Sequence, residues 1–135
     1  MANCCFTEYI VEGPKEELQS LYDKMLQVSK MDQPLIKNDW GVTFLGCLVE
    51  ILGGNWKEVY CRGYFLNLTN NIAESGIIKF DTDTAWVEMA QTRLFLERKY
   101  PQLKFYYVSE ESGCNYYDSN DTAGKYWPKL NKKYF

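Results

Sequence analysis

The order of hydrophobic and polar positions along the chain predicts strands and helices in the order β-α-β-β-α-β. Residues 4–12 are rich in β-forming side chains, and Gly13-Pro14 ends this first strand. Apolar side chains then recur at spacings of three and four, as on one face of an amphipathic helix. This helix is expected to end near Lys30, and its spaced apolar residues are Leu18, Leu21, Tyr22, Met25 and Leu26.

The middle of the chain supplies the second half of this order. The expected elements are strands over residues 59–68 and 77–82, a polar turn at residues 69–76 between them, a helix, and a last strand from Leu103. The helix is expected to begin where Asp83 or Thr84 can cap it, and to end at Lys99 before a Tyr-Pro pair.

Two further elements are expected outside this order. Apolar residues from Leu45 to Leu52 fall at helical spacing, and Gly53-Gly54 follows, which predicts a short extra helix. A buried strand is the alternative, because the apolar run is short and residues 42–44 are β-formers. Residues 114–117 and 125–135 also show strand patterns, so we expect a C-terminal β extension, with a proline placing its last part at a sheet edge.

These elements predict an α+β fold of the ferredoxin-like type. We expect one domain over residues 1–135, with a four-stranded antiparallel sheet and two helices on one face, plus the extra helix and the β extension. The other face of the sheet is then left without helices. The chain has 11 Tyr and 4 Trp, and exposed apolar patches usually mark contacts, so this face is a candidate interface. The extra helix or the C-terminal extension is the alternative cover for it.

Composition excludes several kinds of chemistry. The chain has no histidine, which removes Ser-His and Cys-His nucleophilic pairs and most catalytic zinc sites. Its net charge of −3 argues against a nucleic-acid binder, which usually carries a basic field. Neither a signal peptide nor a membrane-spanning apolar run is visible, so we expect a cytoplasmic protein without a membrane partner.

The five cysteines are expected to be free, buried thiols, because a cytoplasmic compartment is reducing and free Cys behaves as a small hydrophobe. Cys4 and Cys5 are neighbours on a strand and point to opposite faces, so they are poorly placed to share a metal. We therefore assign no metal ligands and no cofactor.

Two groups of carboxylates are weighed as sites. Asp81, Asp83 and Glu88 lie near the expected start of the second helix and are oxygen ligands suited to a divalent cation. Capping of that helix is the interpretation we favour, with Trp86 just inside it as a core anchor. The second group is better explained by a solvated hairpin than by acid–base chemistry, and it comprises Glu110, Glu111, Asp118 and Asp121.

Basic and aromatic segments raise the question of nucleic-acid binding. Residues 62–66, Arg-Gly-Tyr-Phe-Leu, are similar to the central strand motif of RNA-binding sheets, whose aromatics stack on bases. The match falls on the second strand instead of the third, and Phe65 replaces a small residue. An ordinary strand in which Gly63 permits close backbone approach is the favoured interpretation. The lysines of the C-terminal tail are likewise interpreted as edge-strand protection, with an acidic partner as the alternative.

Several short motifs resemble the YubB-type ferredoxin-like domain family. They are Asn3-Cys4-Cys5, Gly13, Phe80-Asp81-Thr82 followed by Ala85-Trp86, and Tyr100-Pro101-x-Leu103-x-Phe105. The chain departs from the family pattern where Cys4 replaces a Trp, where two residues separate Thr82 from Ala85, and where Gln102 replaces an Asp. The resemblance implies a ferredoxin-like sandwich of the kind found in bacterial plasmid, phage and other mobile-element proteins. It implies no iron–sulfur cluster, and it supplies no catalytic residues, because the family has no established activity.

We therefore expect a small, non-catalytic interaction module that binds a protein partner or a second copy of itself. A single-stranded nucleic-acid-binding module is the first alternative, and a carboxylate-based hydrolase or transferase is the second. No catalytic residue is assigned. The candidate surface residues are Arg62, Tyr64, Asp81, Asp83, Trp86, Glu110 and Glu111.

Overall fold

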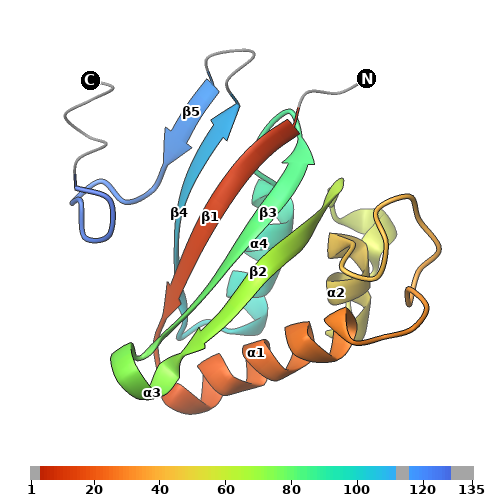
Figure 1. Cartoon of the computed structure of the whole chain (residues 1–135), viewed down its shortest axis with the longest axis horizontal. Helices are drawn as coiled ribbons and strands as arrows, with labels where there is room; N and C mark the ends of the chain where they lie inside the picture. The colour runs from red at the N-terminus through yellow and green to blue at the C-terminus, as the bar shows by residue number, and fades with distance from the viewer. Residues whose placement is uncertain (1–3, 112–115, 129–135) are drawn as a thin grey trace.

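Within the residues that the computed structural model describes, 4–111 and 116–128, five antiparallel strands form one sheet in the order β2-β3-β1-β4-β5 (Figure 1). The strands are β1 (Cys4–Glu12), β2 (Gly63–Asn71), β3 (Ile77–Ala85), β4 (Lys104–Glu111) and β5 (Tyr116–Ser119). The helices are α1 (Lys15–Ser29), α2 (Leu45–Ile51), the short 3-10 helix η1 (Trp56–Glu58), α3 (Ile72–Ser75) and α4 (Ala90–Lys99). The predicted α+β class is confirmed, and the described sheet has a fifth strand beyond the four expected.

The central strand, β1, pairs with both β3 and β4, so that Tyr9 lies opposite Phe80 on one side and Tyr107 on the other. Successive side chains of a strand point to opposite faces. Cys5, Thr7, Tyr9 and Val11 are therefore buried on the face that α1, α2 and α4 cover, which we call the inner face. The alternate residues of β1 point to the opposite, outer face.

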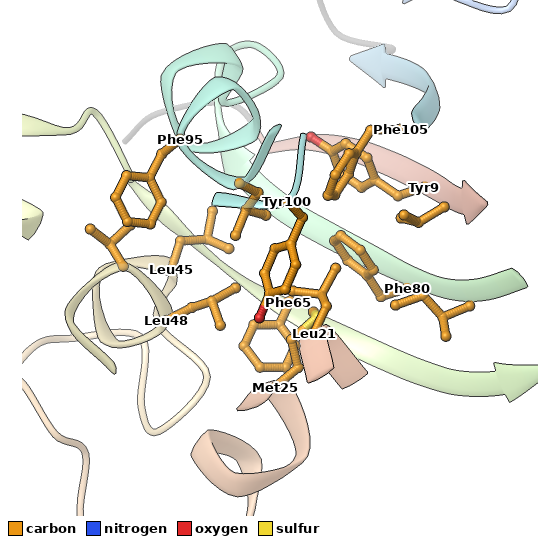
Figure 2. Close-up of a cluster of buried hydrophobic side chains, with 14 of the residues drawn as sticks. Tyr9, Leu21, Met25, Leu45, Leu48, Phe65, Phe80, Phe95, Tyr100 and Phe105 are labelled. Carbon is orange, nitrogen blue, oxygen red and sulfur yellow. The ribbon is translucent and has the colours of Figure 1, made fainter. Parts of the chain in front are cut away.

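The hydrophobic core fills the space between the inner face and the helices (Figure 2). α1 contributes Leu21 and Met25, α2 contributes Leu48, and the strands contribute Phe65 and Phe105, all of them almost without solvent exposure. Burying each such side chain stabilises the fold by roughly 1.5–3 kcal/mol. The helical spacing of apolar residues in α1 and α2 thus has a direct energetic reason.

The predicted start of the second long helix was wrong. Asp83 and Thr84 belong to β3, because the ladder with β1 continues as far as the pair Cys4 and Ala85. Trp86 then takes a left-handed backbone conformation, with φ of 71°, and α4 begins only at Ala90. The side chain of Trp86 is 45% exposed, so it is not the core anchor that we expected.

The second predicted strand was displaced along the chain. Residues 56–58 form η1, and β2 begins at Gly63, where an added Cβ would collide with the backbone of Asp83 and with Thr84. This close approach confirms the interpretation of Gly63. At its other end β2 passes a bulge after Leu66 and continues to Asn71, and α3 occupies the rest of the expected polar turn.

The extra helix is confirmed as α2. The strand that was its alternative is limited to the two residues before the helix, which pair with β2. Phe44 forms an isolated antiparallel bridge with Tyr64, and the carbonyl of Thr43 accepts a hydrogen bond from the N–H of Phe65. β5 gives the expected β extension at the other edge of the sheet, next to β4 (Figure 1). Residues 125–128 are not a strand as expected, and residues 129–135 lie outside the described part. None of the described helices is long and apolar enough to cross a membrane.

Candidate functional site

One half of the outer face is covered by residues 120–128, which follow β5. The Nζ of Lys125 lies 2.7 Å from a carboxylate oxygen of Glu12, and the hydroxyl of Tyr126 donates to the same oxygen. The ring of Tyr126 meets that of Tyr106 edge-on at 5.1 Å between centroids. Ile10 and Tyr106 are buried as a result. The C-terminal extension, one of the two expected covers, thus covers the outer face at the end of β1 that carries Ile10 and Glu12 and at the adjoining end of β4.

A tight turn holds this covering segment in place. The carboxylate of Asp121 is buried and accepts hydrogen bonds from the backbone N–H groups of Lys125, Tyr126 and Trp127, each at 2.9 Å. Burial opposes ionisation of Asp121, and the three backbone donors outweigh it, so the pKa of Asp121 is lowered. Asp121 is therefore a structural anchor, and the expectation of a solvated acidic hairpin was wrong for it.

The other half of the outer face carries a group of carboxylates around an exposed aromatic ring, which we call the acidic patch: Phe6, Glu8, Asp81, Asp83 and Glu110. The registers place Glu8 of β1 directly opposite Asp81 of β3. Phe6 lies between Asp83 of β3 and Glu110 of β4, and its side chain is 42% exposed. Four negative charges therefore surround one apolar contact point.

Neighbouring side chains hold two of these carboxylates in position. The Nδ2 of Asn67 donates to Asp81 at 2.8 Å, and the hydroxyl of Tyr64 lies 3.3 Å from Asp83 as a donor. Asn67 can reach Asp81 because it lies at the β2 bulge with φ of 56°, a conformation that Asn tolerates better than most residues. The patch is thus built from three adjacent strands and a bulge.

The charges of the acidic patch repel one another. Partial burial and then the charge of Asp81 raise the pKa of Glu8; Glu110 adds to the effect and Lys79 opposes it. Like charges directly opposite one another in a sheet destabilise it by up to about 1 kcal/mol. The arrangement costs folding energy, and a cationic ligand on this surface would recover it.

The structure brings together four of the seven candidate surface residues: Tyr64, Asp81, Asp83 and Glu110 lie on the open half of the outer face. Arg62 is exposed just before β2, and Trp86 is exposed in the turn after β3. Glu111 points to the inner face and is buried, because it follows Glu110 on the same strand. The seven candidate residues therefore do not form one site, although four of them lie in or beside the acidic patch.

A buried polar network on the inner face was not predicted from the sequence. The carboxylate of Glu88 is 3% exposed and accepts hydrogen bonds from the hydroxyl of Tyr9 at 2.7 Å and from Arg93 Nε at 2.9 Å. Arg93 also contacts Glu97 at 3.2 Å, one turn further along α4, and its guanidinium lies 4.9 Å from the centroid of the Tyr107 ring. The partners of Glu88 are distant in sequence or five residues apart, so no periodic pattern reveals them.

The network around Glu88 is a structural joint rather than a reaction centre. Burial, and then Glu88, raise the pKa of Tyr9. The ion pair with Glu88 raises the pKa of Arg93 even though burial opposes it. The space that Tyr9 and Arg93 line is only about 10 Å³, at the lower limit for one water molecule. It offers no room for a substrate, and the buried carboxylate fixes the turn before α4 to the sheet.

The described thiols are also unsuited to chemistry. Cys5, Cys47 and Cys61 are free and buried, as expected. Burial raises the pKa of Cys5, and it raises that of Cys61 to about 11, so both are thiols at neutral pH. The side chain of Cys4 and the whole of Cys114 lie outside the described part.

Metal-ligating side chains do not gather in the described ranges 4–111 and 116–128, where no group of three or more Cys, Asp and Glu side chains could hold an ion. Asp81, Asp83 and Glu88 are not a cluster at a helix end as expected, because Asp81 and Asp83 lie on the outer face of β3 and Glu88 is buried on the inner side.

No protein-family model matches the chain, no curated protein is significantly similar to it, and no solved structure matches it at a significant level.

Proposed function

We propose that the protein is a non-catalytic interaction module that binds a basic segment of a protein partner on the acidic patch. The observation that carries this proposal is the position of four carboxylates around the ring of Phe6, which is exposed among the described residues. A segment that alternates Lys or Arg with apolar residues would place cations against the carboxylates and an apolar side chain against Phe6. Complementary charge gives such an interface both specificity and a fast association rate.

The charge of the patch separates this partner from the other candidates. A second copy of the chain would bring an identical set of carboxylates face to face, so self-association through this surface is disfavoured. Phosphate groups would be repelled in the same way, and the sheet surface on which RNA-binding domains stack bases is acidic here. A basic protein segment meets neither obstacle.

We also propose the ferredoxin-like topology, with β5 added at one edge, for the fold that presents the patch. It is supported by the strand order β2-β3-β1-β4 together with helices between β1 and β2 and between β3 and β4. Membership of the YubB-type family is a further proposal, and the short motifs of the sequence support it.

The test is a binding titration followed by NMR amide shifts. The probes are a short peptide that alternates Lys with apolar residues, the same peptide with Glu in place of Lys, and a single-stranded oligouridylate. The proposal predicts shifts on β1 and β3 with the Lys peptide alone, and a Kd that rises with salt. Equal shifts with the Glu peptide, or binding of the oligouridylate to these strands, would contradict it.

Variants locate the binding surface. The double substitution Glu8→Gln and Asp81→Asn should weaken the Lys peptide about fivefold, since each exposed charge contributes roughly 0.5 kcal/mol. Glu16→Gln combined with Asp23→Asn is the matched control, because it also removes two exposed carboxylates, and both lie on α1, away from the outer face. If the control variant loses as much affinity for the Lys peptide as the double variant, then net charge, and not the acidic patch, determines the binding.

A further inference from the structure

An open hollow with aromatic walls lies beside the α2 end of the molecule. Its volume is about 530 Å³, which is within the range of about 300–1,000 Å³ that is typical of small-molecule sites. Its walls come from the segment before α2, from η1 with the residues that follow it, and from the first turn of α4. We call it the aromatic hollow, and it shares no residue with the acidic patch.

The aromatic walls are held at fixed angles. The ring of Trp40 stacks on that of Phe44 at 5.2 Å with 11° between the planes, and Phe44 meets Trp56 edge-on at 5.8 Å. Phe44 is itself fixed by its bridge to β2. Trp40 keeps 38% of its surface exposed, and Tyr60 keeps 41%. Flat surfaces of this kind attract planar rings, which prefer offset or edge-to-face contacts with aromatic side chains.

The backbone around the hollow is ordered before any ligand arrives. Tyr60 donates its N–H to Gln91 Oε1 at 2.8 Å and accepts at its carbonyl from Thr92 Oγ1 at 2.9 Å, which ties this wall to α4. Asn38 ties the Trp40 wall, since its Oδ1 accepts from the N–H of Gly41 at 2.8 Å. Preorganised walls reduce the entropy that binding would otherwise lose.

The rim of the hollow is cationic in a chain whose net charge is −3. Lys57 and Arg62 line it, against the single carboxylate of Glu58. Among the described residues neither cation forms an ion pair, whereas Arg93 and Lys125 both do. The carbonyl of Arg62 accepts a hydrogen bond from the N–H of Ala85 at 3.0 Å, which fixes the backbone from which the Arg62 side chain extends. Arg presents a planar fork that matches a phosphate or a carboxylate.

We propose that the aromatic hollow binds a small planar ring that carries a phosphate or a carboxylate. The ring lies against the exposed faces of Trp40 and Tyr60, and the anion pairs with Arg62. Aromatic walls of this kind can also bind an organic cation. Here Lys57 and Arg62 outnumber the single carboxylate of Glu58, so a cationic ligand would be repelled. A fully apolar ligand would leave Arg62 unpaired, so the charge selects the anion.

The test is a titration monitored at the tryptophan indole N–H signals by NMR. The probes are the nucleoside 5′-monophosphates as ring phosphates and indole-3-acetate as a ring carboxylate, with inorganic phosphate, adenosine and phenethylammonium as controls. We expect shifts at Trp40 and Trp56 but not at Trp127, and binding of one or both anionic ring classes about tenfold tighter than any control. Phosphate alone binding as tightly, or phenethylammonium binding better, would overturn the proposal.

Matched variants assign the anion contact. Arg62→Gln should weaken the ring anion about tenfold and Arg62→Lys should restore part of the loss, because Lys keeps the charge without the fork. Arg98→Gln is the control, since Arg98 is exposed in the last turn of α4 and does not line the hollow. Both side chains are exposed, so melting temperatures should stay unchanged. Equal affinity in Arg62→Gln and Arg98→Gln would remove Arg62 from the site.

Discussion

A single carboxylate, that of Glu88, joins the turn after β3 to the central strand and to α4. It accepts hydrogen bonds from the hydroxyl of Tyr9 and from the Nε of Arg93, and its side chain has almost no contact with solvent. A buried charge pair of this kind adds little net stability over an apolar pair, but removal of one partner leaves the other uncompensated. The cost of losing Glu88 is therefore set by what remains around Arg93.

Glu88→Gln should lower the free energy of unfolding by about 3 kcal/mol, because it strips the guanidinium of Arg93 of its buried counter-charge. Urea denaturation followed by fluorescence measures the change. Glu97→Gln is the matched control, since Glu97 also pairs with Arg93 but is 32% exposed at its side chain. Its loss should stay below about 1 kcal/mol. Equal losses for the two variants would mean that Arg93, not its buried partner, sets the stability.

Four residues of the open outer face were candidate surface residues from the sequence, although their common face was not predicted. The pattern indicated a helix start for Asp81 and Asp83, whereas strand alternation along β3 places both on the outer face. The bond between Tyr9 and Glu88 joins residues 79 positions apart, and only tertiary packing brings them together. Arg62 could likewise be selected from its sequence motif, whereas the hollow that it lines forms only through tertiary packing.

At the scale of elements, the segment of residues 120–128 decides how much of the sheet is available. Its turn depends on three backbone N–H groups that donate to Asp121. Backbone donors left without a partner under a buried surface cost about 1–3 kcal/mol each. The Asp121 carboxylate is thus the point at which the covering segment can be released without a change in the sheet itself.

Asp121→Ala should destabilise the covering segment and expose Tyr106 and Ile10 on the outer face, because three backbone donors lose their acceptor together. Hydrogen exchange at the amides of residues 120–128 should rise at least about tenfold, while exchange in β1 stays slow, since local opening is separate from global unfolding. Lys125→Ala is the control, because it removes an exposed ion pair with Glu12 and two ring contacts of the ammonium group but leaves the Asp121 acceptor in place. Unchanged exchange in Asp121→Ala would show that the aromatic contacts alone hold the segment.

Element boundaries show where local preference gives way to the sheet. Asp83 and Thr84 favour a helix N-cap, but the β1 ladder satisfies their backbone groups as far as Ala85 and keeps them in a strand. Helix α1, by contrast, ends within a residue of its expected position because its buried apolar stripe continues as far as Val28. Periodicity therefore located the elements, and strand pairing set their ends.

At the scale of the whole molecule, the two halves of the outer face respond oppositely to ionisation. Glu8 has a raised pKa, so its ionised form is disfavoured in the folded state, and this penalty exists above the folded pKa. Glu12 is partly buried, which opposes ionisation, but hydrogen bonds from Lys125 and Tyr126 lower its pKa. Its contribution to stability is present above the unfolded pKa and is lost as the pH falls through the lower folded value.

Glu8→Gln and Glu12→Gln should therefore shift stability in opposite directions at neutral pH. At pH 7, Glu8→Gln should raise the free energy of unfolding by about 0.5 kcal/mol, since it removes repulsion from Asp81, and Glu12→Gln should lower it by a similar amount. Both differences should shrink toward zero in acid, that of Glu8 as the pH falls through the unfolded pKa and that of Glu12 only as it falls through the lower folded pKa. Urea titrations across this range measure them. If the free energy of unfolding of each variant differs from that of the wild type by the same amount at every pH, then packing, and not charge, separates the two halves.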